Sequence, residues 1–436
     1  MLRVAVAGAG LGGLCLAQGL ARAGIDVRVY ERDAALNARR QGYRLHVDAR
    51  AGLALEKCLP PRLFRLFLAT TSRPSTRMTV LSPRLRVLHE TPAGPGRDPD
   101  DPSTLSTSVD RGTLREILAA GLEERAHYGR ELIGYEDGPE GVTLRFADGA
   151  TTRADVLVGA DGVGSAVRRV RLPDARLVDT GTSVIYGKTP LDDATRRLVP
   201  PALSSGFTAI TGGRAGLACG LVEFRRPPAE AAAEIAPDVR LSPAGDYVMW
   251  ALSGAEPAGA ERAGPLSGAE PAGMGSGAEP TGADAAALHA VAVRAIRSWH
   301  PDLRALLAAA AVDETFLIRI RSSRRVPVWA PSRVTLLGDA IHAMSPARGS
   351  GANTALMDAA LLCDALTGAG ARTGRDARTG RDARTGGGDL IAAIGAYEAR
   401  MRDYGFAAVE ASRRAEAETA RRGNPVGRWL LRHLPR

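Results

Sequence analysis

A glycine-rich turn near the N-terminus constrains the fold of this 436-residue chain more than any other feature. The turn reads Gly-Ala-Gly-Leu-Gly-Gly over residues 8–13, between a short apolar run, 2–7, and a segment with helical spacing, 14–23. A turn of this kind between a strand and a helix is typical of a dinucleotide-binding unit. We therefore expect an α/β fold whose first helix directs its N-terminus at a pyrophosphate.

Each glycine of the turn has its own physical role. Gly8 permits the tight turn, Gly10 lets the backbone approach the pyrophosphate, and Gly13 lets the helix pack closely on the strand. A second apolar segment, 25–30, ends at Glu31, which follows Gly13 by 18 residues. That interval is close to the ~20 residues expected for an acid that bonds a ribose hydroxyl. FAD and NAD share such an ADP half, so this unit alone leaves both open.

Two further motifs with glycine and aspartate follow predicted strands. The first runs from Asp161 to Arg168, directly after a buried run at 156–160. The second starts at the end of another apolar run and comprises Gly338, Asp339, Pro346, Gly349, Gly351, Asn353 and Asp358. Because the second motif could meet the same ligand as the N-terminal turn, the pair favours one bound flavin.

The three motifs, in this order and at this approximate spacing, resemble those of the class A (single-component) flavoprotein monooxygenases. That family contains para-hydroxybenzoate hydroxylase and the tetracycline-inactivating hydroxylases, and the resemblance covers almost the whole chain. It implies an α/β fold with a Rossmann-like FAD-binding domain, an inserted antiparallel-sheet substrate domain and C-terminal helices. It also implies that NADPH or NADH acts as a transient reductant of the flavin. A flavin C4a-hydroperoxide would then pass one oxygen atom from O2 to an aromatic or polycyclic molecule of secondary metabolism.

The resemblance also assigns cofactor contacts. Asp339 would bond the ribityl or ribose hydroxyls, and the N–H groups of 349–353 would face the pyrimidine edge of the isoalloxazine, where the next helix begins. Arg111 matches an arginine that contacts FAD. The predicted cofactor-binding residues are Gly8, Gly10, Gly13, Glu31, Arg32, Arg39, Arg111, Asp161, Arg168, Gly338, Asp339, Pro346, Gly349, Gly351 and Asn353.

Several of these residues also have simpler interpretations. Asp161 and Asp339 could cap turns, as aspartate often does after strands, and Arg111 could be solvated. Arg32 and Arg39 would flank the adenosine and the nicotinamide donor, although Arg40 could serve instead of Arg39.

No catalytic residue is identified from the pattern. The chain offers no Ser/His/Asp or Cys/His nucleophilic set, and His342 is expected to pack beside the flavin loop without a catalytic role. Three side chains are candidates for a base that deprotonates a phenolic substrate: Tyr186, Trp250 and His46.

Composition excludes several other classes of protein. The net charge is +9, yet only two of the 57 basic residues are lysine, and the arginines are scattered instead of forming a nucleic-acid-binding stripe. No run reaches the ~18 apolar residues of a membrane span, so we expect a cytoplasmic protein without stable membrane insertion, as a monomer or homodimer. The four cysteines lack metal-ligand spacing, so no metal site is expected.

The order of motifs and low-complexity segments predicts a discontinuous domain plan. Copies of Ser-Gly-Ala-Glu-Pro start at 253, 267 and 276, and a six-residue repeat fills 371–385. We expect an FAD-binding domain at 1–72, 103–178 and 326–366, a substrate domain at 73–102 and 179–325 with a mobile insert at 253–283, a linker at 367–388 and a helical segment at 389–436.

Two alternatives to oxygen insertion remain at this point. An FAD oxidase or dehydrogenase would remove hydride without inserting oxygen, and a flavin-bearing binding protein would use the flavin only to shape a pocket. The chain has a single dinucleotide fingerprint, which disfavours oxygenases with two such domains, and its four tryptophans never fall two apart as in the flavin halogenases.

Overall fold

The glycine-rich turn lies at the end of the central strand of a five-stranded parallel sheet. The computed structural model describes residues 1–38, 43–75, 77–92, 98–204, 206–212, 215–255, 284–376 and 386–421. The sheet has the order β17-β11-β1-β2-β7, with β1 (Arg3–Ala7), β2 (Asp26–Tyr30), β7 (Ala126–His127), β11 (Val156–Gly159) and β17 (Val334–Leu336). All residues of β11 and nearly all of β1 are buried, as parallel strands covered on both faces should be.

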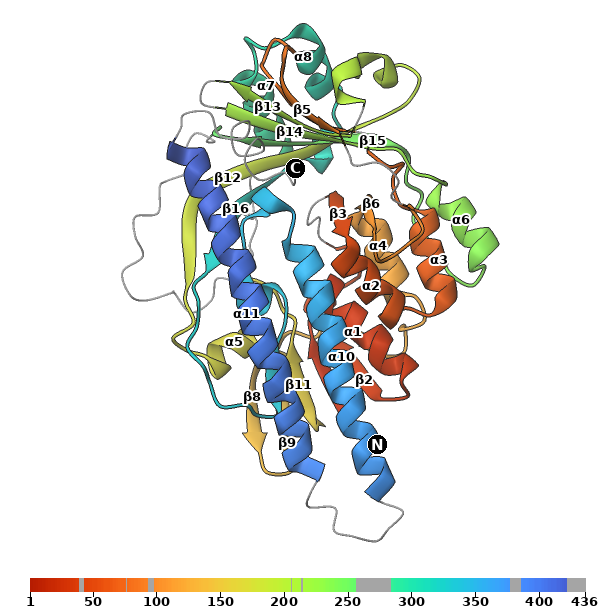
Figure 1. Cartoon of the computed structure of the whole chain (residues 1–436), viewed down its shortest axis with the longest axis vertical. Coiled ribbons are helices and arrows are strands. Elements are labelled where there is room, and N and C mark those ends of the chain that lie inside the picture. Colours follow the sequence, from red (N-terminus) through yellow and green to blue (C-terminus); the bar gives the residue numbers. More distant parts are fainter. Residues whose placement is uncertain are drawn as a thin grey trace.

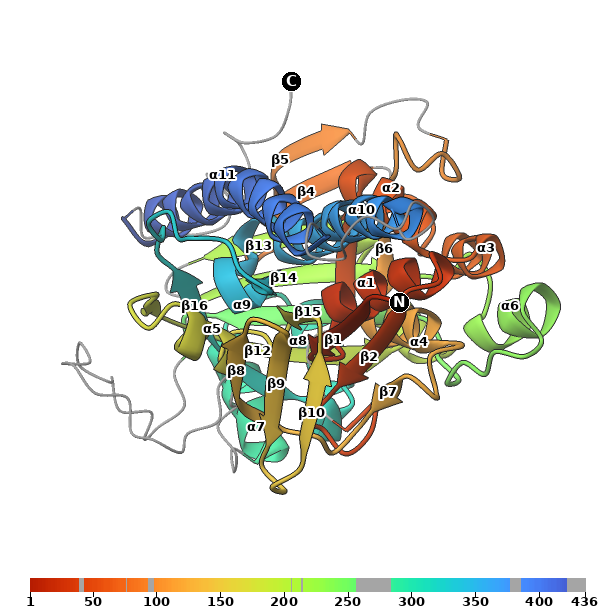
Figure 2. The same cartoon turned by 90° about the horizontal axis from the view of Figure 1, so that it is seen from below.

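Helices cover one side of this sheet, and a small antiparallel sheet lies on the other (Figure 2). The first helix, α1 (Leu11–Arg22), packs on α10 (Gly351–Asp376), which also contacts α2 (Ala49–Cys58) and α11 (Gly386–Arg421). α3 (Pro61–Ala69) contacts α4 (Arg111–Ala119), which contacts α1. The small sheet comprises β8 (Leu132–Gly138), β9 (Gly141–Phe146) and β10 (Thr151–Ala154), next to the short helix α5 (Ala166–Arg171). The predicted Rossmann-like α/β fold is confirmed.

A seven-stranded sheet forms the other end of the molecule (Figure 1). Its order is β16-β12-β15-β14-β13-β4-β5, with β4 (Arg77–Leu81), β5 (Val87–Pro92), β12 (Leu177–Pro190), β13 (Gly206–Gly212), β14 (Ala215–Val222), β15 (Tyr247–Ser253) and β16 (Phe316–Ser323). Every pair is antiparallel except β4 with β13, which is parallel. The outer face of the sheet packs on α7 (Ala285–Ala295) and α8 (Pro301–Ala308), while its inner face is turned toward the parallel-sheet half.

A two-stranded ribbon lies between the two halves (Figure 1). It pairs β3 (Arg44–Asp48) with β6 (Ser106–Asp110) in antiparallel register. β3 contacts α10 and β6 contacts β14, so the ribbon connects the helical layer with the inner face of the seven-stranded sheet. The remaining short elements are α6 (Pro228–Ile235), α9 (Asp339–His342), η1 (Thr195–Leu198), η2 (Pro201–Leu203), η3 (Val312–Glu314) and η4 (Pro346–Arg348).

The structure differs from the sequence-based plan in two segments. α10 continues to Asp376, ten residues into the predicted linker that starts after 366, because each residue added to an existing helix gains a hydrogen bond without the cost of a new nucleus. α6 contacts α3, and buried side chains of 231–241 join the core of the parallel-sheet half although the range was assigned to the substrate domain.

Other parts of the plan fall outside the described residues. These are 256–283, which contain most of the predicted mobile insert, 377–385 within the predicted linker, and the end of the predicted helical segment from 422 onward. The domain boundaries therefore stay a prediction. Among the described helices, none combines the length and apolar character that a membrane span requires.

Candidate functional site

The glycines of the N-terminal turn have the geometry that close packing requires. Gly8 has a φ of +106°, and a Cβ there would overlap the carbonyl oxygen of Ala160, directly after β11. A Cβ on Gly13 would overlap the carbonyl oxygen of Gly8. Gly10 differs, because a Cβ at this position would meet no atom within 4 Å. Two glycines are therefore required by the fold, and Gly10 leaves open space over the start of α1.

Glu31 at the end of β2 is directed back at this turn. Its Oε2 accepts a hydrogen bond of 2.8 Å from the Ala9 N–H, and its Oε1 accepts one of 3.0 Å from the Asp33 N–H. The side chain is buried, with 7% of the residue exposed. Glu31 thus holds the N-terminal turn in place, and its carboxylate oxygens keep further lone pairs for a ligand hydroxyl.

Arg115 is a buried side chain of α4 that contacts the N-terminal turn, and the sequence analysis did not identify it. Its Nε donates to the Ala9 carbonyl oxygen at 2.9 Å, a second nitrogen donates to the Leu36 carbonyl, and the guanidinium lies 3.8 Å from Glu31. One signal was available, since Arg115 follows Arg111 by four residues and so shares its helix face.

The two oxygens of the Asp161 carboxylate have different surroundings. Its Oδ2 accepts hydrogen bonds from the N–H groups of Ala166 (2.7 Å) and Val167 (3.3 Å), which caps the start of α5. Its Oδ1 is buried and has no hydrogen-bond partner in the part of the chain that the structure describes. Burial raises the pKa of Asp161, although the Ser165 side chain and these N–H donors favour the carboxylate. An orphaned buried oxygen of this kind is costly unless a ligand satisfies it.

Arg168 joins the two aspartate motifs. Its Nη1 donates to the carbonyl oxygen of Ala340 and its Nη2 to that of Val163, both at 2.8 Å, and only 6% of the residue is exposed. These bonds position the loops that carry Asp161 and Asp339. We expected Arg168 to lie near the cofactor, and its shown contacts are those of a positioning residue.

Asp339 and Arg111 approach each other from distant parts of the chain. Asp339 is exposed at the start of α9, directly after Gly338, whose φ is +61°. Burial and the neighbouring Arg115 charge lower the pKa of Arg111 to about 10, while Asp339 acts in the opposite direction. Arg111 is still a cation at neutral pH, so a positive and a negative group lie within electrostatic reach of each other.

A fully buried carboxylate holds the Gly338 turn in place. Asp358 on α10 accepts a hydrogen bond of 2.7 Å from the Gly338 N–H, and its Oδ2 lies 2.6 Å from Nε2 of His342. Its Oδ1 accepts a hydrogen bond of 2.5 Å from the Tyr404 hydroxyl on α11. His342 therefore helps to hold the carboxylate that fixes the turn.

Asn353 ties the loop before α10 to the ribbon. Its Nδ2 donates to the carbonyl oxygens of His46 and Gly349, and its Oδ1 accepts from the Asp48 N–H, all at 2.9 Å. These bonds use the two donors of the amide and one lone pair of its oxygen, so the side chain shapes the loop. Gly349 adopts the left-handed conformation with φ +60°.

The first N–H groups of α10 are the part of this loop that is suited to an anion. Pro346 begins the short η4 helix, Gly349 ends it, and α10 then starts at Gly351. Its first intrahelical donor among the described bonds is Thr354, which donates to Ser350. Helix N-termini leave such early N–H groups for ligands, and their dipole favours negative charge.

Aromatic side chains collect on the inner face of the seven-stranded sheet. Tyr186 stacks on Phe316 with ring centroids 5.6 Å apart, and Tyr43 of the ribbon meets Phe316 edge-on at 5.4 Å. We call this group the aromatic cluster; it consists of Tyr43, Tyr186, Val222, Phe224, Tyr247, Met249 and Phe316. The cluster provides an apolar wall opposite the cofactor motifs.

Only some of the candidate bases lie on this side. Trp250 is fully buried against the outer-face helices, because strand residues alternate and Met249 occupies the inner face. This finding removes Trp250 from the candidates. Tyr186 belongs to the aromatic cluster, and burial raises its pKa to about 12, so it stays protonated at neutral pH. His46 is exposed beside the Gly349 loop.

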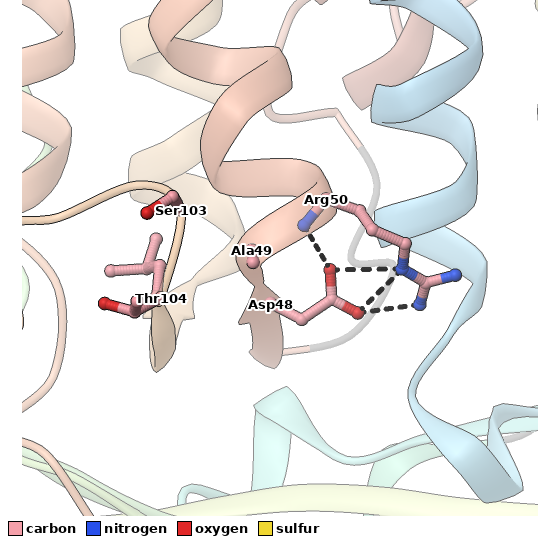
Figure 3. A pocket seen from close by; sticks show the side chains of 6 residues that line it. Asp48, Ala49, Arg50, Ser103 and Thr104 are labelled. Atoms are coloured by element: carbon pink, nitrogen blue, oxygen red, sulfur yellow. Dashed lines mark hydrogen bonds and ion pairs between the residues drawn. The ribbon is translucent and has the colours of Figure 1, made fainter. Parts of the chain in front are cut away.

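A surface hollow of about 460 Å³ lies near this region but is a separate feature (Figure 3). It is lined by Asp48, Ala49, Arg50, Ser103, Thr104 and Leu105. In Figure 3, Asp48 and Arg50 bind each other across the start of α2. None of the lining residues belongs to the three motifs, so the hollow is not the flavin site.

The residues at the motif ends fit a flavin dinucleotide. The open space above Gly10 suits a pyrophosphate, the orphaned Oδ1 of Asp161 and the exposed Asp339 carboxylate suit hydroxyl donors, and the α10 N-terminus suits an electron-rich ring edge. Arg32, the next residue after Glu31, is partly buried. Arg39 and Arg40 lie outside the described residues, so their contacts stay predictions, as do the individual cofactor bonds of the other site residues.

Models of two known domains match the chain. The FAD binding domain matches residues 294–378, and the NAD(P)-binding Rossmann-like domain matches residues 6–59. The dual O-methyltransferase/FAD-dependent monooxygenase CTB3 of Cercospora beticola is 36% identical over 375 residues, which cover 83% of this chain and 42% of that protein. The chain thus spans about two fifths of the length of this relative.

A bacterial relative is matched over most of its length. The 3-amino-4-hydroxybenzoate 2-monooxygenase PtnB3 of Streptomyces platensis is 30% identical over 382 residues, covering 84% of this chain and 80% of that enzyme.

Solved structures share the fold. A FAD-containing protein of Photorhabdus luminescens, assigned as a monooxygenase, superposes with a TM-score of 0.72 at 28% identity, covering 95% of this chain and 97% of that one. HpxO of Klebsiella pneumoniae, solved with FAD and uric acid, has a TM-score of 0.66 at 24% identity over 95% and 87% of the two chains. With the PtnB3 match and the FAD-domain match, the chain belongs to the FAD-dependent monooxygenases of the class A, single-component type.

Proposed function

We propose that this protein uses NADPH or NADH and O2 to insert one oxygen atom into an aromatic or polycyclic small molecule. The observation that carries the proposal is the aromatic cluster on the inner face of the seven-stranded sheet, opposite the three cofactor motifs. Near these motifs, the Ser323 N–H at the end of β16 donates to the Ala343 carbonyl oxygen at 2.8 Å. This bond connects the seven-stranded sheet directly to the chain that follows Asp339.

FAD, when bound, supplies hydride acceptance from the nicotinamide and activation of O2. Arg111 and the N-terminus of α10 would favour negative charge on the ring system. The Asp339 carboxylate would accept hydrogen bonds from cofactor hydroxyls. The aromatic cluster would exclude water from the reacting face, which limits wasteful loss of the activated oxygen as H2O2. With its pKa raised to about 12, Tyr186 would donate a hydrogen bond there instead of taking up a proton.

The substrates of relatives support an aromatic or polycyclic class. PtnB3 is named for 3-amino-4-hydroxybenzoate, and a second bacterial relative is the aurachin C monooxygenase/isomerase of Stigmatella aurantiaca, 25% identical over 370 residues.

A panel of phenols, hydroxybenzoates, naphthols and polycyclic aromatics tests the proposal. The FAD-loaded protein is mixed with NADPH or NADH under ¹⁸O2, and nicotinamide oxidation, H2O2 and product mass are recorded. We expect at least one compound to stimulate nicotinamide oxidation and to gain one labelled oxygen atom. H2O2 equal to all nicotinamide consumed, with no labelled product, would instead indicate an oxidase. No nicotinamide oxidation with any compound would favour a non-redox role.

A further inference from the structure

We propose that Arg44 anchors an anionic oxygen substituent, a carboxylate or an ionised acidic phenol, of the aromatic substrate. This proposal rests on the proposed function, because it names the chemistry of the molecule that the aromatic cluster receives. Nothing in the three cofactor motifs points to Arg44, which lies on the ribbon between the two halves of the molecule.

The position of Arg44 on β3 places it between the Gly349 loop before α10 and the seven-stranded sheet. Arg44 and His46 are two residues apart on one strand, so their side chains share a face and their Cα atoms are about 7 Å apart. His46 contacts this loop twice: its carbonyl accepts from Asn353, and its Cβ lies 3.8 Å from where a Cβ of Gly349 would be. An anchor at Arg44 would therefore hold a ring close to the loop that receives the flavin.

The Arg44 side chain lies against the inner face of the sheet. Its guanidinium carbon is 5.5 Å from the centre of the Phe207 ring. Phe207, Gly220 and Met249 are register partners on three adjacent strands and so form one row. A Cβ on Gly220 would lie 2.6 Å from Arg44 Cδ. The missing side chain at Gly220 thus creates the space through which the arginine reaches the sheet.

Arg44 has no ionic partner among the described residues. Its Nε is buried without a hydrogen-bond partner, and none of the described ion pairs includes it. Burial lowers the pKa of Arg44 to about 10, which leaves it charged at neutral pH, and the Tyr247 phenol is the one group that acts in the other direction. Desolvating a charged group is costly unless it is paired, so a partly buried guanidinium with an unpartnered Nε favours an incoming anion.

The nearest candidate counter-ion is already committed. Asp110 on β6 is the register partner of Arg44, yet its Oδ1 accepts from the Thr113 N–H at 2.8 Å and its Oδ2 accepts from the Tyr247 hydroxyl at 2.8 Å. Lys188, which lies over the Tyr247 ring, pairs with Glu314 at 2.7 Å. By contrast, the buried Arg115 and Arg168 donate to backbone carbonyls. Arg44 is only partly buried, but it combines an apolar surround with a buried, unsatisfied guanidinium nitrogen.

The test compares acids with neutral isosteres by binding alone. The oxidised, FAD-loaded protein is titrated calorimetrically, without nicotinamide, with 4-hydroxybenzoate against 4-hydroxybenzamide and with 2-naphthoate against 2-naphthamide. An acidic polyphenol is titrated below and above its pKa to separate phenolate from carboxylate recognition. We expect at least one acid to bind about tenfold or more tightly than its neutral form, as a desolvated charge pair should.

Three variants test whether Arg44 causes the preference for the acid. Arg44→Met keeps the apolar stem and should remove the preference for the anion, whereas Arg44→Lys should restore part of it. Arg319→Met, an exposed arginine of β16, is the matched control and should change nothing. Because Arg44→Met removes an unpaired, partly buried charge, its thermal midpoint should equal or exceed that of the wild type.

Several results would overturn the inference. These are an anion preference that survives in Arg44→Met, wild-type protein that binds no acid of the panel better than its neutral form, and a marked loss of thermal stability in Arg44→Met, which would make Arg44 a structural residue. Since no turnover is involved, these outcomes are independent of whether labelled oxygen enters a product.

Discussion

The buried carboxylate of Asp358 should control both the stability of the fold and the affinity for FAD. It accepts hydrogen bonds from the Gly338 N–H, from His342 and from the Tyr404 hydroxyl, and it is fully buried. The perturbation we consider is Asp358→Asn, which keeps the shape of the side chain. An amide carries no charge, so the ion pair with His342 is lost, and its NH2 group requires the Tyr404 hydroxyl to turn from donor to acceptor.

The expected cost follows from the character of these bonds. A hydrogen bond to a charged group contributes about 1.5–3 kcal/mol, and breaking a buried ion pair costs about 3–5 kcal/mol. We therefore expect Asp358→Asn to lower the free energy of unfolding by about 3–5 kcal/mol, a large share of the ~5–15 kcal/mol typical of a domain. FAD affinity should fall as well, because the Gly338 N–H loses its fixed partner and the turn before Asp339 loosens.

The penalty should depend on pH with a defined sign. Burial disfavours the charge of His342, but the Asp358 charge and its hydrogen bond outweigh this effect and raise the pKa of His342 above 6.5. Asp339 on α9 adds to the rise, and Tyr404 on α11 contacts the same carboxylate. A raised folded-state pKa gives a contribution that is complete below about pH 6.5 and is lost as pH rises through the folded value.

Urea denaturation at fixed saturating FAD, repeated from pH 5.5 to 9 on the wild type and the variant, measures this difference. The stability gap should be widest at the acidic end and should narrow toward the alkaline end. Asp364→Asn, on the same helix but in an exposed pair with Lys57, is the control and should change stability by about 0–1 kcal/mol. A gap below about 1 kcal/mol for Asp358→Asn, or one that widens with rising pH, would refute the reasoning.

Other variants give further tests. Gly10→Ala should leave the thermal midpoint unchanged, because its Cβ would meet no protein atom, but it should weaken FAD binding in fluorescence titrations, because the Cβ would occupy the space left for the cofactor. Gly13→Ala should lower the free energy of unfolding by about 1–3 kcal/mol, because its Cβ would overlap the backbone. Equal stabilities of the two variants would contradict this. Arg115→Met should cost about 3–5 kcal/mol in urea denaturation, because Glu31 would be left buried without its cation, and an unchanged midpoint would count against the contact. Trp250→Phe should lower stability but leave FAD affinity intact, and an effect on FAD titration would mean that the assigned sheet face is wrong.

Much of the fold was predictable from local patterns. The turn from Gly8 to Gly13 follows a buried strand and opens α1, and the aspartates 161 and 339 come at or just after the ends of β11 and β17, which are neighbours in the parallel sheet. Because the carboxyl ends of parallel strands meet at one edge, such motifs converge even when they are hundreds of residues apart. The family resemblance and the FAD-binding fold are confirmed.

The remaining features depend on tertiary packing that local patterns do not encode. β15 is buried on both faces, so Tyr247 and Trp250 give no alternation that would show which face each occupies. Arg115 acts through partners in the N-terminal turn and after β2, and Tyr404 through a partner on another helix. Asp161 performs a capping role with one oxygen while leaving the other open. The unsatisfied state of Arg44 likewise depends on the partners that Asp110 finds elsewhere.

The central claim is that the N-terminal turn and the distant Gly338-Asp339 motif form a single FAD site. Titration of flavin-free protein with FAD, followed by fluorescence quenching, tests this claim most directly. We expect saturation at an equimolar ratio and weaker binding in both Gly10→Ala and Asp339→Ala, with folding retained in each. Absence of saturable binding in the wild type, or undiminished affinity in either variant, would contradict it.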